Sequence, residues 1–129
     1  MEASDPFGYG RIVRDDAGDV VEIVEQKDCT PEQAAITECN SGFYCFDIEL
    51  LFSALEEVST DNAQGEYYLT DVLGIARKRG QRVLAFKAED PTECLGVNSR
   101  IQLAQATRIL QQRINEAHMA AGVTTMDPS

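Results

Sequence analysis

The hydrophobic and polar positions of this chain change their period several times, which predicts short strands alternating with helices. Two strand-forming runs, at residues 11–13 and 20–25, flank the segment DDAGD, whose aspartates and glycine accept the backbone angles of a turn. This arrangement predicts a β-hairpin. Two further apolar runs of strand length cover residues 39–46 and 83–88.

Helical spacing or helix caps mark four other segments, at residues 32–36, 48–55, 68–78 and 99–120. The first follows Thr30, which begins a capping box, and the second follows Asp47, whose side chain is suited to cap a helix. The fourth is long, has an apolar stripe and ends at Gly122. Strands that alternate with helices indicate an α/β fold.

The size and charge of the chain limit its function. Its 129 residues correspond to one domain, and 43% of them are hydrophobic, which suffices for a core. The formal net charge is −11, so a nucleic acid and an anionic membrane would be repelled. Small anions remain candidate ligands, because backbone N–H groups and one or two cations can hold a phosphate locally.

The cysteines do not form a metal-binding pattern. There are four, with a single histidine and no C-x-x-C pair, which argues against a zinc site. No apolar stretch reaches the ~20 residues that a membrane helix needs, and no leader-like segment opens the chain. We therefore expect a cytoplasmic protein with free thiols and without a membrane partner.

Five short segments, spread over the chain in a fixed order, resemble one enzyme family. They are GYGRIVR from Gly8, VEQKD from Val24, ECNSG from Glu38, NAQGEYYLTD from Asn62 and GVNSR from Gly96. In this order and at this spacing they are similar to the sugar-binding part of bacterial N-acetylglucosamine-1-phosphate uridylyltransferase. Each segment alone is short and loop-like, so the resemblance depends on their combination.

The resemblance covers nearly the whole chain, and it implies a fold more specific than α/β. The expected fold is a partial Rossmann-like nucleotidyltransferase, with a mixed sheet and flanking helices. Residues 1–129 would be a single incomplete domain, the C-terminal half of the nucleotidyltransferase domain, and the helix at 99–121 would be a connector. The family's glycine-rich nucleotide loop is expected upstream of Met1.

The resemblance implies that Gly10, Glu25 and Asn40 contact the sugar substrate. At Gly10 the missing Cβ would let the backbone approach the ligand; the alternative is a tight turn before a strand. Glu25 would accept hydrogen bonds from sugar hydroxyls, whereas an edge carboxylate can also be merely solvated. Asn40 would offer one donor and one acceptor to the sugar, although an asparagine at such a place also forms local turns.

Two further positions, Tyr68 and Thr70, match residues that line the N-acetyl pocket of the family. The alternative is that they are exposed hydroxyl residues at the start of a helix. Lys27 could approach the sugar phosphate, but a lysine at the end of an edge strand is usually solvated. We rank Tyr68 and Thr70 below the first three positions and assign no role to Lys27.

Asn98 matches the family asparagine that coordinates the catalytic Mg²⁺ together with an aspartate from the other half of the domain. Mg²⁺ prefers oxygen ligands and keeps several waters, so one amide oxygen is a suitable ligand. The competing interpretation is that Asn98 caps the long helix, because one oxygen cannot do both.

The family enzyme uses UTP and N-acetylglucosamine 1-phosphate and forms UDP-N-acetylglucosamine. By this resemblance the chain supplies the acceptor-sugar side, carries no catalytic residue of its own and is expected to be inactive alone. Two alternatives stay open: a nucleotidyltransferase for another hexose 1-phosphate, and a non-catalytic module for sugar-nucleotide binding or assembly. The segment NAQGEYYLTD argues against the first alternative, because it resembles the enzymes for N-acetyl sugars.

The predicted strands are too few to cover the apolar faces of the predicted helices. Leu51 and Phe52 on the second helix, with Leu103 and Leu110 on the last, are expected to lack partners in part. Exposed apolar surface of this kind predicts self-association or a loosely packed monomer that binds a hydrophobic dye.

Overall fold

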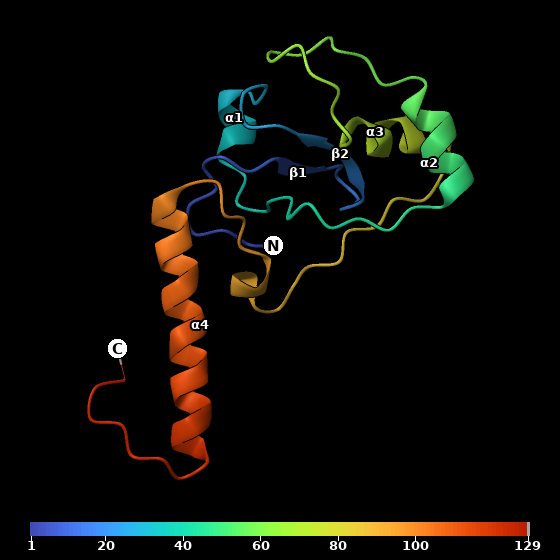
Figure 1. The fold of residues 1–129 in the computed structure, drawn as a ribbon. Helices are drawn as coiled ribbons and strands as arrows, with labels where there is room; N and C mark the ends of the chain where they lie inside the picture. Colours follow the sequence, from blue (N-terminus) through green and yellow to red (C-terminus); the bar gives the residue numbers. More distant parts are fainter. Residues whose placement is uncertain (129) are drawn as a thin grey trace. The chain divides into compact units, whose positions relative to one another are not determined.

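The structure is a computed structural model that describes residues 1–128 (Figure 1). Its elements in chain order are β1 (Arg11–Arg14), β2 (Val20–Val24), α1 (Pro31–Ala34), α2 (Ile48–Leu55), α3 (Asp71–Lys78), the 3₁₀ helix η1 (Pro91–Cys94) and α4 (Arg100–Ala120). The chain divides into two compact units, with the boundary between Pro91 and Thr92. Each unit is described by itself.

The predicted hairpin is confirmed. Strand β1 pairs with β2 in antiparallel register, with Ile12 opposite Ile23 and an irregularity after Val13. The turn is held by the Asp15 carboxylate, which accepts hydrogen bonds from the backbone N–H groups of two residues in the turn. Gly18 has a φ of 86°, which only glycine adopts readily, and this explains its place in the turn.

The core of the first unit is small and lies on one face of the hairpin. It consists of the buried residues Ile12, Val20 and Ile23, and three partly buried side chains pack against it: Tyr44, Leu73 and Val83. Helix α3 lies along β2 and buries Val72 and Ala76, and α2 lies against α3. The packed part of the unit is therefore the hairpin with α3.

Two predicted strands are wrong. Residues 39–46 contribute only an isolated bridge between Arg11 and Cys39, and residues 83–88 have no strand pairing. A strand exists only when its backbone pairs with a neighbour, and the described residues contain one sheet, of two strands. The structure is thus a small mixed α/β arrangement, and the wider Rossmann-like sheet stays a proposal.

The first two helices begin where their caps predict. Thr30 and Gln33 form both bonds of the capping box before α1, which ends at Ala34, two residues earlier than predicted. The Asp47 carboxylate accepts a hydrogen bond from the Leu50 N–H and caps α2. Helix α2 buries only Ala54, so its predicted apolar face is not packed on a sheet.

Helix α3 begins at Asp71, three residues later than predicted. Thr70 occupies the N-cap position, but its side chain makes no capping bond, because the hydroxyl is used elsewhere. Tyr68 lies outside the helix, in the connection that precedes it.

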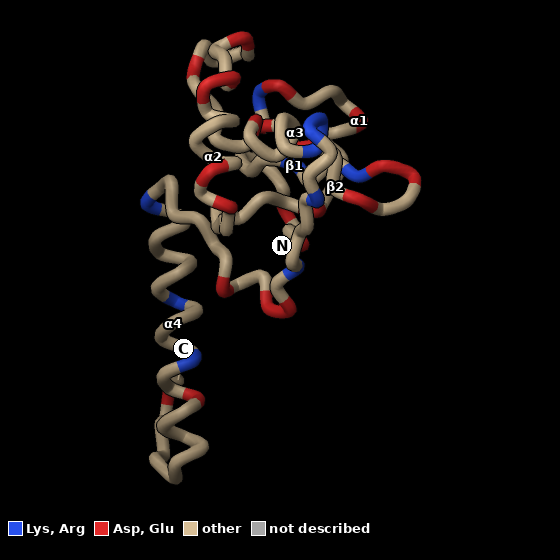
Figure 2. The backbone as a smooth tube through the Cα atoms, turned by 90° about the vertical axis from the view of Figure 1, so that its right-hand side faces the viewer, with Lys and Arg blue, Asp and Glu red and all other residues tan. Residues whose placement is uncertain are grey.

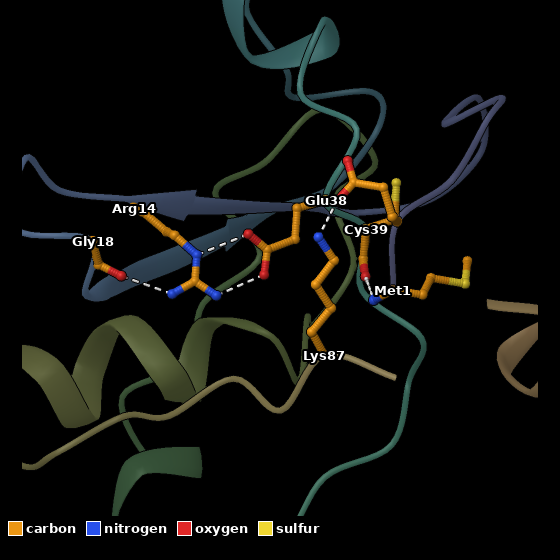
Figure 3. A network of polar contacts seen from close by, with 7 residues as sticks. Met1, Arg14, Gly18, Glu38, Cys39 and Lys87 are labelled. Carbon is orange, nitrogen blue, oxygen red and sulfur yellow. Dashed lines mark hydrogen bonds and ion pairs between the residues drawn. The ribbon is translucent and has the colours of Figure 1, made fainter. Parts of the chain in front are cut away.

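A polar network fastens the segment around Cys39 to the hairpin (Figure 3). The Arg14 guanidinium makes two hydrogen bonds to the Glu38 carboxylate, of 2.8 and 2.6 Å, and a third to the carbonyl of Gly18 at 2.7 Å. The Met1 amino group donates to the carbonyl of Cys39 at 2.9 Å. These bonds hold residues 38 and 39 next to β1, although the pairing is too short for a strand.

Ion pairs join α3 and its C-terminal end to the hairpin turn and to the segment after α2. Arg77 pairs with Asp15 in the hairpin turn at 2.7 Å and with Asp19 at 3.5 Å, and Arg79 pairs with Glu57 after α2. Acidic positions are distributed over several loops of the first unit rather than gathered at one place (Figure 2).

The second unit contains the long helix α4, and Ser99 is its N-cap. None of the residues of α4 is buried, and the predicted stripe is exposed at Leu103, Leu110 and Ile114. Among the described helices, none combines the length and the apolar character that a membrane crossing requires.

Candidate functional site

The candidate site begins at the open end of the hairpin, where Gly10 precedes β1 and Glu25 follows β2. Because Arg11 pairs with Val24, these two residues are the next neighbours across the strands. A Cβ on Gly10 would lie 2.9 Å from Cγ2 of Ile23 and 3.3 Å from Oε2 of Glu25. Only glycine leaves room here, so the backbone at Gly10 approaches the Glu25 carboxylate directly.

Thr70 holds the other oxygen of that carboxylate. Its hydroxyl donates to Oε1 of Glu25 over 3.1 Å, and the residue is 5% exposed. This bond brings together residues 45 positions apart in the chain. Thr70 does lie at a helix start, as the N-cap of α3, but the alternative that its hydroxyl is exposed is wrong.

Asn40 lies on the other side of Gly10. Its backbone N–H donates to the carbonyl of Gly10 over 2.8 Å, and its side-chain carbonyl accepts from the N–H of Gly42 over 3.0 Å. The same side chain donates through Nδ2 to the Tyr44 phenol oxygen over 2.6 Å. Asn40 therefore forms the local turn of the alternative interpretation and also neighbours Gly10, while its contact with a sugar stays a prediction.

Tyr44 belongs to the same cluster, and sequence reasoning missed it. Burial raises the pKa of the Tyr44 phenol; the hydrogen bond from Asn40 opposes this rise, and the nearby Glu25 charge adds to it. The phenol thus stays protonated and can serve as a neutral donor. The sequence offered no specific signal, because an aromatic residue in a predicted strand is usually a core residue.

Tyr68 is joined to the segment after β2 by a hydrogen bond to Asp28. Its hydroxyl donates to Oδ2 of Asp28 over 3.1 Å, and Oδ1 of the same carboxylate accepts from the backbone N–H of Ala63 over 2.7 Å. Desolvation raises the pKa of the Tyr68 phenol; a hydrogen bond from Gln64 opposes the rise, and Asp28 increases it. Asp28 is a second residue that sequence reasoning missed, because a carboxylate after a strand gives no sign of what it will bind.

Lys27 does not lie free at the strand end. Its ammonium donates to Oε1 of Gln64 over 2.6 Å, and Nε2 of Gln64 donates to the Tyr68 hydroxyl over 2.7 Å. Lys27 and Asp28 together therefore fasten the connection before α3 to the end of β2.

Asn98 lies in the second unit and is exposed. The cap of α4 is Ser99, whose hydroxyl accepts from the N–H of Gln102 over 3.1 Å, while the Asn98 N–H donates to Oε1 of Gln102 over 2.8 Å. The interpretation of Asn98 as the helix cap is therefore wrong, and its amide oxygen is not used for capping. Within residues 1–128 no group of three or more His, Cys, Asp or Glu side chains could hold a metal ion, and the metal role of Asn98 stays a prediction.

A cavity of about 210 Å³ adjoins the cluster at Thr70. Glu22, Asp71 and Lys78 are among its lining residues, whereas Gly10, Glu25 and Asn40 are not. The cavity therefore shares one wall with the cluster and is not the space in front of Glu25.

The first unit thus brings together four of the six predicted site residues: Gly10, Glu25, Asn40 and Thr70. They provide a carboxylate, an amide, a hydroxyl and an accessible backbone, which are groups that recognise hydroxyl-bearing ligands. Neither a histidine nor an activated thiol lies among them, so the arrangement is suited to binding and orienting a ligand.

Comparison with known proteins gives a consistent relationship. A family model described as nucleotidyl transferase matches residues 1–92. The protein named bifunctional protein GlmU of Lactobacillus delbrueckii subsp. bulgaricus is 61% identical over 128 residues, which are 99% of this chain and 28% of that protein.

Proteins of the same name in other organisms are similar to this chain as well. The one from Lactobacillus gasseri is 61% identical over 127 residues, and the one from Halalkalibacterium halodurans is 57% identical over 127 residues. In both comparisons the match covers 98% of this chain and 28% of the relative. The chain therefore spans less than a third of the length of these relatives.

Proposed function

Because the chain belongs to the nucleotidyl transferase family, we propose that it supplies the acceptor-sugar side of an enzyme that forms UDP-N-acetylglucosamine. The substrates of the complete enzyme are UTP and N-acetylglucosamine 1-phosphate. The high identity to proteins named bifunctional protein GlmU supports this choice within the family.

The observation that carries the proposal is the closed cluster at the hairpin end. The Thr70 hydroxyl donates to one oxygen of the Glu25 carboxylate, and the other oxygen lies close to Gly10, so the protein restricts the orientation of the carboxylate before any ligand arrives. A preorganised acceptor binds sugar hydroxyls without a further ordering cost. Asn40 and Tyr68 would read neighbouring groups of the same sugar.

In the proposed reaction an oxygen of the sugar phosphate attacks the α-phosphorus of UTP and pyrophosphate leaves. This chain binds and orients the attacking sugar phosphate, which makes the reaction effectively unimolecular. Asn98 fits the role of one oxygen ligand for Mg²⁺, because its amide is not the helix cap. When bound, Mg²⁺ would neutralise charge on the phosphates.

We further propose that the chain alone does not turn over. Its 129 residues contain no G-x-G-T loop with the accompanying lysine for a nucleotide. A second candidate is a non-catalytic module that binds a sugar nucleotide. The cluster at the hairpin end favours it, because the cluster is assembled within the first unit and holds no reactive group.

Binding to the isolated chain tests the proposal. We expect N-acetylglucosamine 1-phosphate to bind in a calorimetric titration, and Glu25→Ala to weaken it about tenfold to a hundredfold, because an unpaired buried hydrogen-bonding site costs about 1–3 kcal/mol. Glu22→Ala is the matched control, since Glu22 is an exposed glutamate of β2 outside the cluster.

Two outcomes contradict the proposal. If the wild-type chain binds glucose 1-phosphate with the same affinity as N-acetylglucosamine 1-phosphate, the assignment to N-acetyl sugars is wrong. If the chain releases pyrophosphate from UTP and this activity disappears in Asn98→Ala, the chain is a complete enzyme and not only the acceptor-sugar side of an enzyme.

A further inference from the structure

Gln26 has an unusual position directly after Glu25. Its side-chain oxygen accepts two hydrogen bonds, from the backbone N–H of Gly8 at 3.0 Å and from Nη2 of Arg11 at 2.8 Å. One amide oxygen thus links the end of β2 to the loop that precedes β1.

Arg11 completes this link from the other side. Its Nη1 donates to the carbonyl of Tyr9, and its Nη2 also lies 3.4 Å from the carbonyl of Ala34. Arg11 is 1% exposed, its Nε has no partner, and none of the ion pairs among residues 1–128 involves it. Burying a cation without a counter-charge is costly. The hydrogen bonds from Arg11 to Gln26 and to backbone carbonyls are therefore what compensates the guanidinium, in place of an ion pair.

The loop held in this way is the one that presents Gly10. Gly8 has a φ of 88°, and the N–H of Tyr9 donates to the carbonyl of Pro6, so the segment is a tight turn. Gln26 fixes the turn at Gly8, and Arg11 fixes it at Tyr9. The next residue, Gly10, is thereby set between Glu25 and the Asn40 N–H.

We infer that Gln26 and Arg11 act as a positioning pair, which fixes the backbone of Gly8 to Gly10 against Glu25 so that this backbone can meet the sugar phosphate. The inference rests on the proposed function for the identity of the ligand. Neither side chain needs to touch the ligand, because both act through the backbone of the loop.

The test compares three changes at Gln26 in the whole 129-residue chain. Gln26→Met removes the acceptor at similar volume, and Gln26→Asn withdraws it by one methylene while keeping an amide. Gln26→Glu keeps an oxygen for both donors and adds a charge opposite Arg11, so it should rescue the loop. Gln33→Met is the matched control, because the Gln33 side chain accepts one backbone hydrogen bond in the α1 cap and does not touch the loop.

Two measurements separate the loop from the ligand. Amide hydrogen exchange by NMR reports the Gly8 N–H in the free chain, and titration with N-acetylglucosamine 1-phosphate reports binding. We expect Gln26→Met and Gln26→Asn to speed exchange at Gly8 and to weaken binding about five- to tenfold, the equivalent of one net hydrogen bond. Gln26→Glu and Gln33→Met should stay close to the wild type in both.

The inference is overturned if Gln26→Asn exchanges and binds like the wild type, or if Gln26→Glu loses as much binding as Gln26→Met. Should Gln26→Met unfold the chain, the pair of Asn and Glu variants decides. If the wild-type chain binds no sugar phosphate, the proposed function fails, and unchanged exchange at Gly8 in Gln26→Asn would then separately reject the positioning pair.

Discussion

The hairpin and the segment at residues 83–88 are both apolar runs of strand length, but they have opposite fates. In the hairpin Ile12 and Ile23 face each other across paired strands and are 8% and 7% exposed. In the second segment Leu84 and Phe86 are 73% and 95% exposed, and no strand pairs with it. The same local pattern therefore gives a packed strand only where a neighbour is available.

This difference also separates the part of the first unit that carries the candidate site from the part that does not. All four clustered site residues lie at or beside the paired strands, where backbone bonds and the core fix them. The exposed segment offers apolar surface instead, which is the kind of surface that favours self-association or dye binding.

The largest expected effect concerns the core of the hairpin. Ile12→Ala should lower the free energy of unfolding by about 2–4 kcal/mol, because it leaves a cavity under the paired strands. Leu84→Ala should change it by less than about 0.5 kcal/mol, since that side chain is mostly in water. Urea denaturation of both variants measures the contrast, and equal losses would show that residues 83–88 are packed in solution.

A smaller effect is expected when Gly10, which lies against the packed hairpin, is compared with Gly74, which lies in the open middle of α3. Gly10→Ala should cost about 1–3 kcal/mol of stability through overpacking against Ile23 and should also impair sugar-phosphate binding. Gly74→Ala, in the middle of α3 with its nearest neighbour 4.0 Å from the new Cβ, should not be strained. It should stabilise the chain by up to about 1 kcal/mol, because alanine favours a helix.

Thermal melts and the binding titration together check this pair of glycines. An undiminished affinity in Gly10→Ala would mean that the close approach of the Gly10 backbone to Glu25 has no role in recognition.

The smallest effect is expected at the ion pair between Arg14 and Glu38. The hydrogen bonds from Arg14 hold the pKa of the Glu38 carboxyl below its usual value. A lowered pKa in the folded state gives stability that is present above the unfolded pKa of about 4.3 and is lost as the pH falls through the folded value.

Glu38→Gln should therefore cost about 1 kcal/mol or less near neutral pH and make little difference in strong acid. Unfolding curves from pH 7 down to pH 3 measure it, with the exposed Glu89→Gln as control. A cost for Glu38→Gln that persists unchanged at low pH would contradict this origin of the acid sensitivity.

Local signals in the sequence predicted the elements that depend on local bonds. The turn aspartate and Gly18 defined the hairpin, and the side chains of Thr30 and Asp47 defined the starts of α1 and α2. The predicted strands at 39–46 and 83–88 failed because a strand depends on a remote partner, which no local pattern reveals.

The same distinction applies to the candidate site. Resemblance to a family pointed to Gly10, Glu25, Asn40 and Thr70, and the structure shows that they are neighbours. It could not show how they are held, because the bond from Thr70 to Glu25 and the bonds that Asp28 and Gln26 accept join residues far apart in sequence. The absence of a side-chain cap on α3 has the same cause, since the Thr70 hydroxyl binds Glu25.

The bond between Thr70 and Glu25 has a consequence for the order in which the site assembles. The hairpin closes a short loop of chain and can form early, whereas this bond closes a separation of 45 residues and needs α3 in place. Transient detachment of α3 would release Glu25 while the hairpin stays paired. A ligand that needs the ordered Glu25 carboxylate should therefore lose affinity when α3 detaches, before the strands separate.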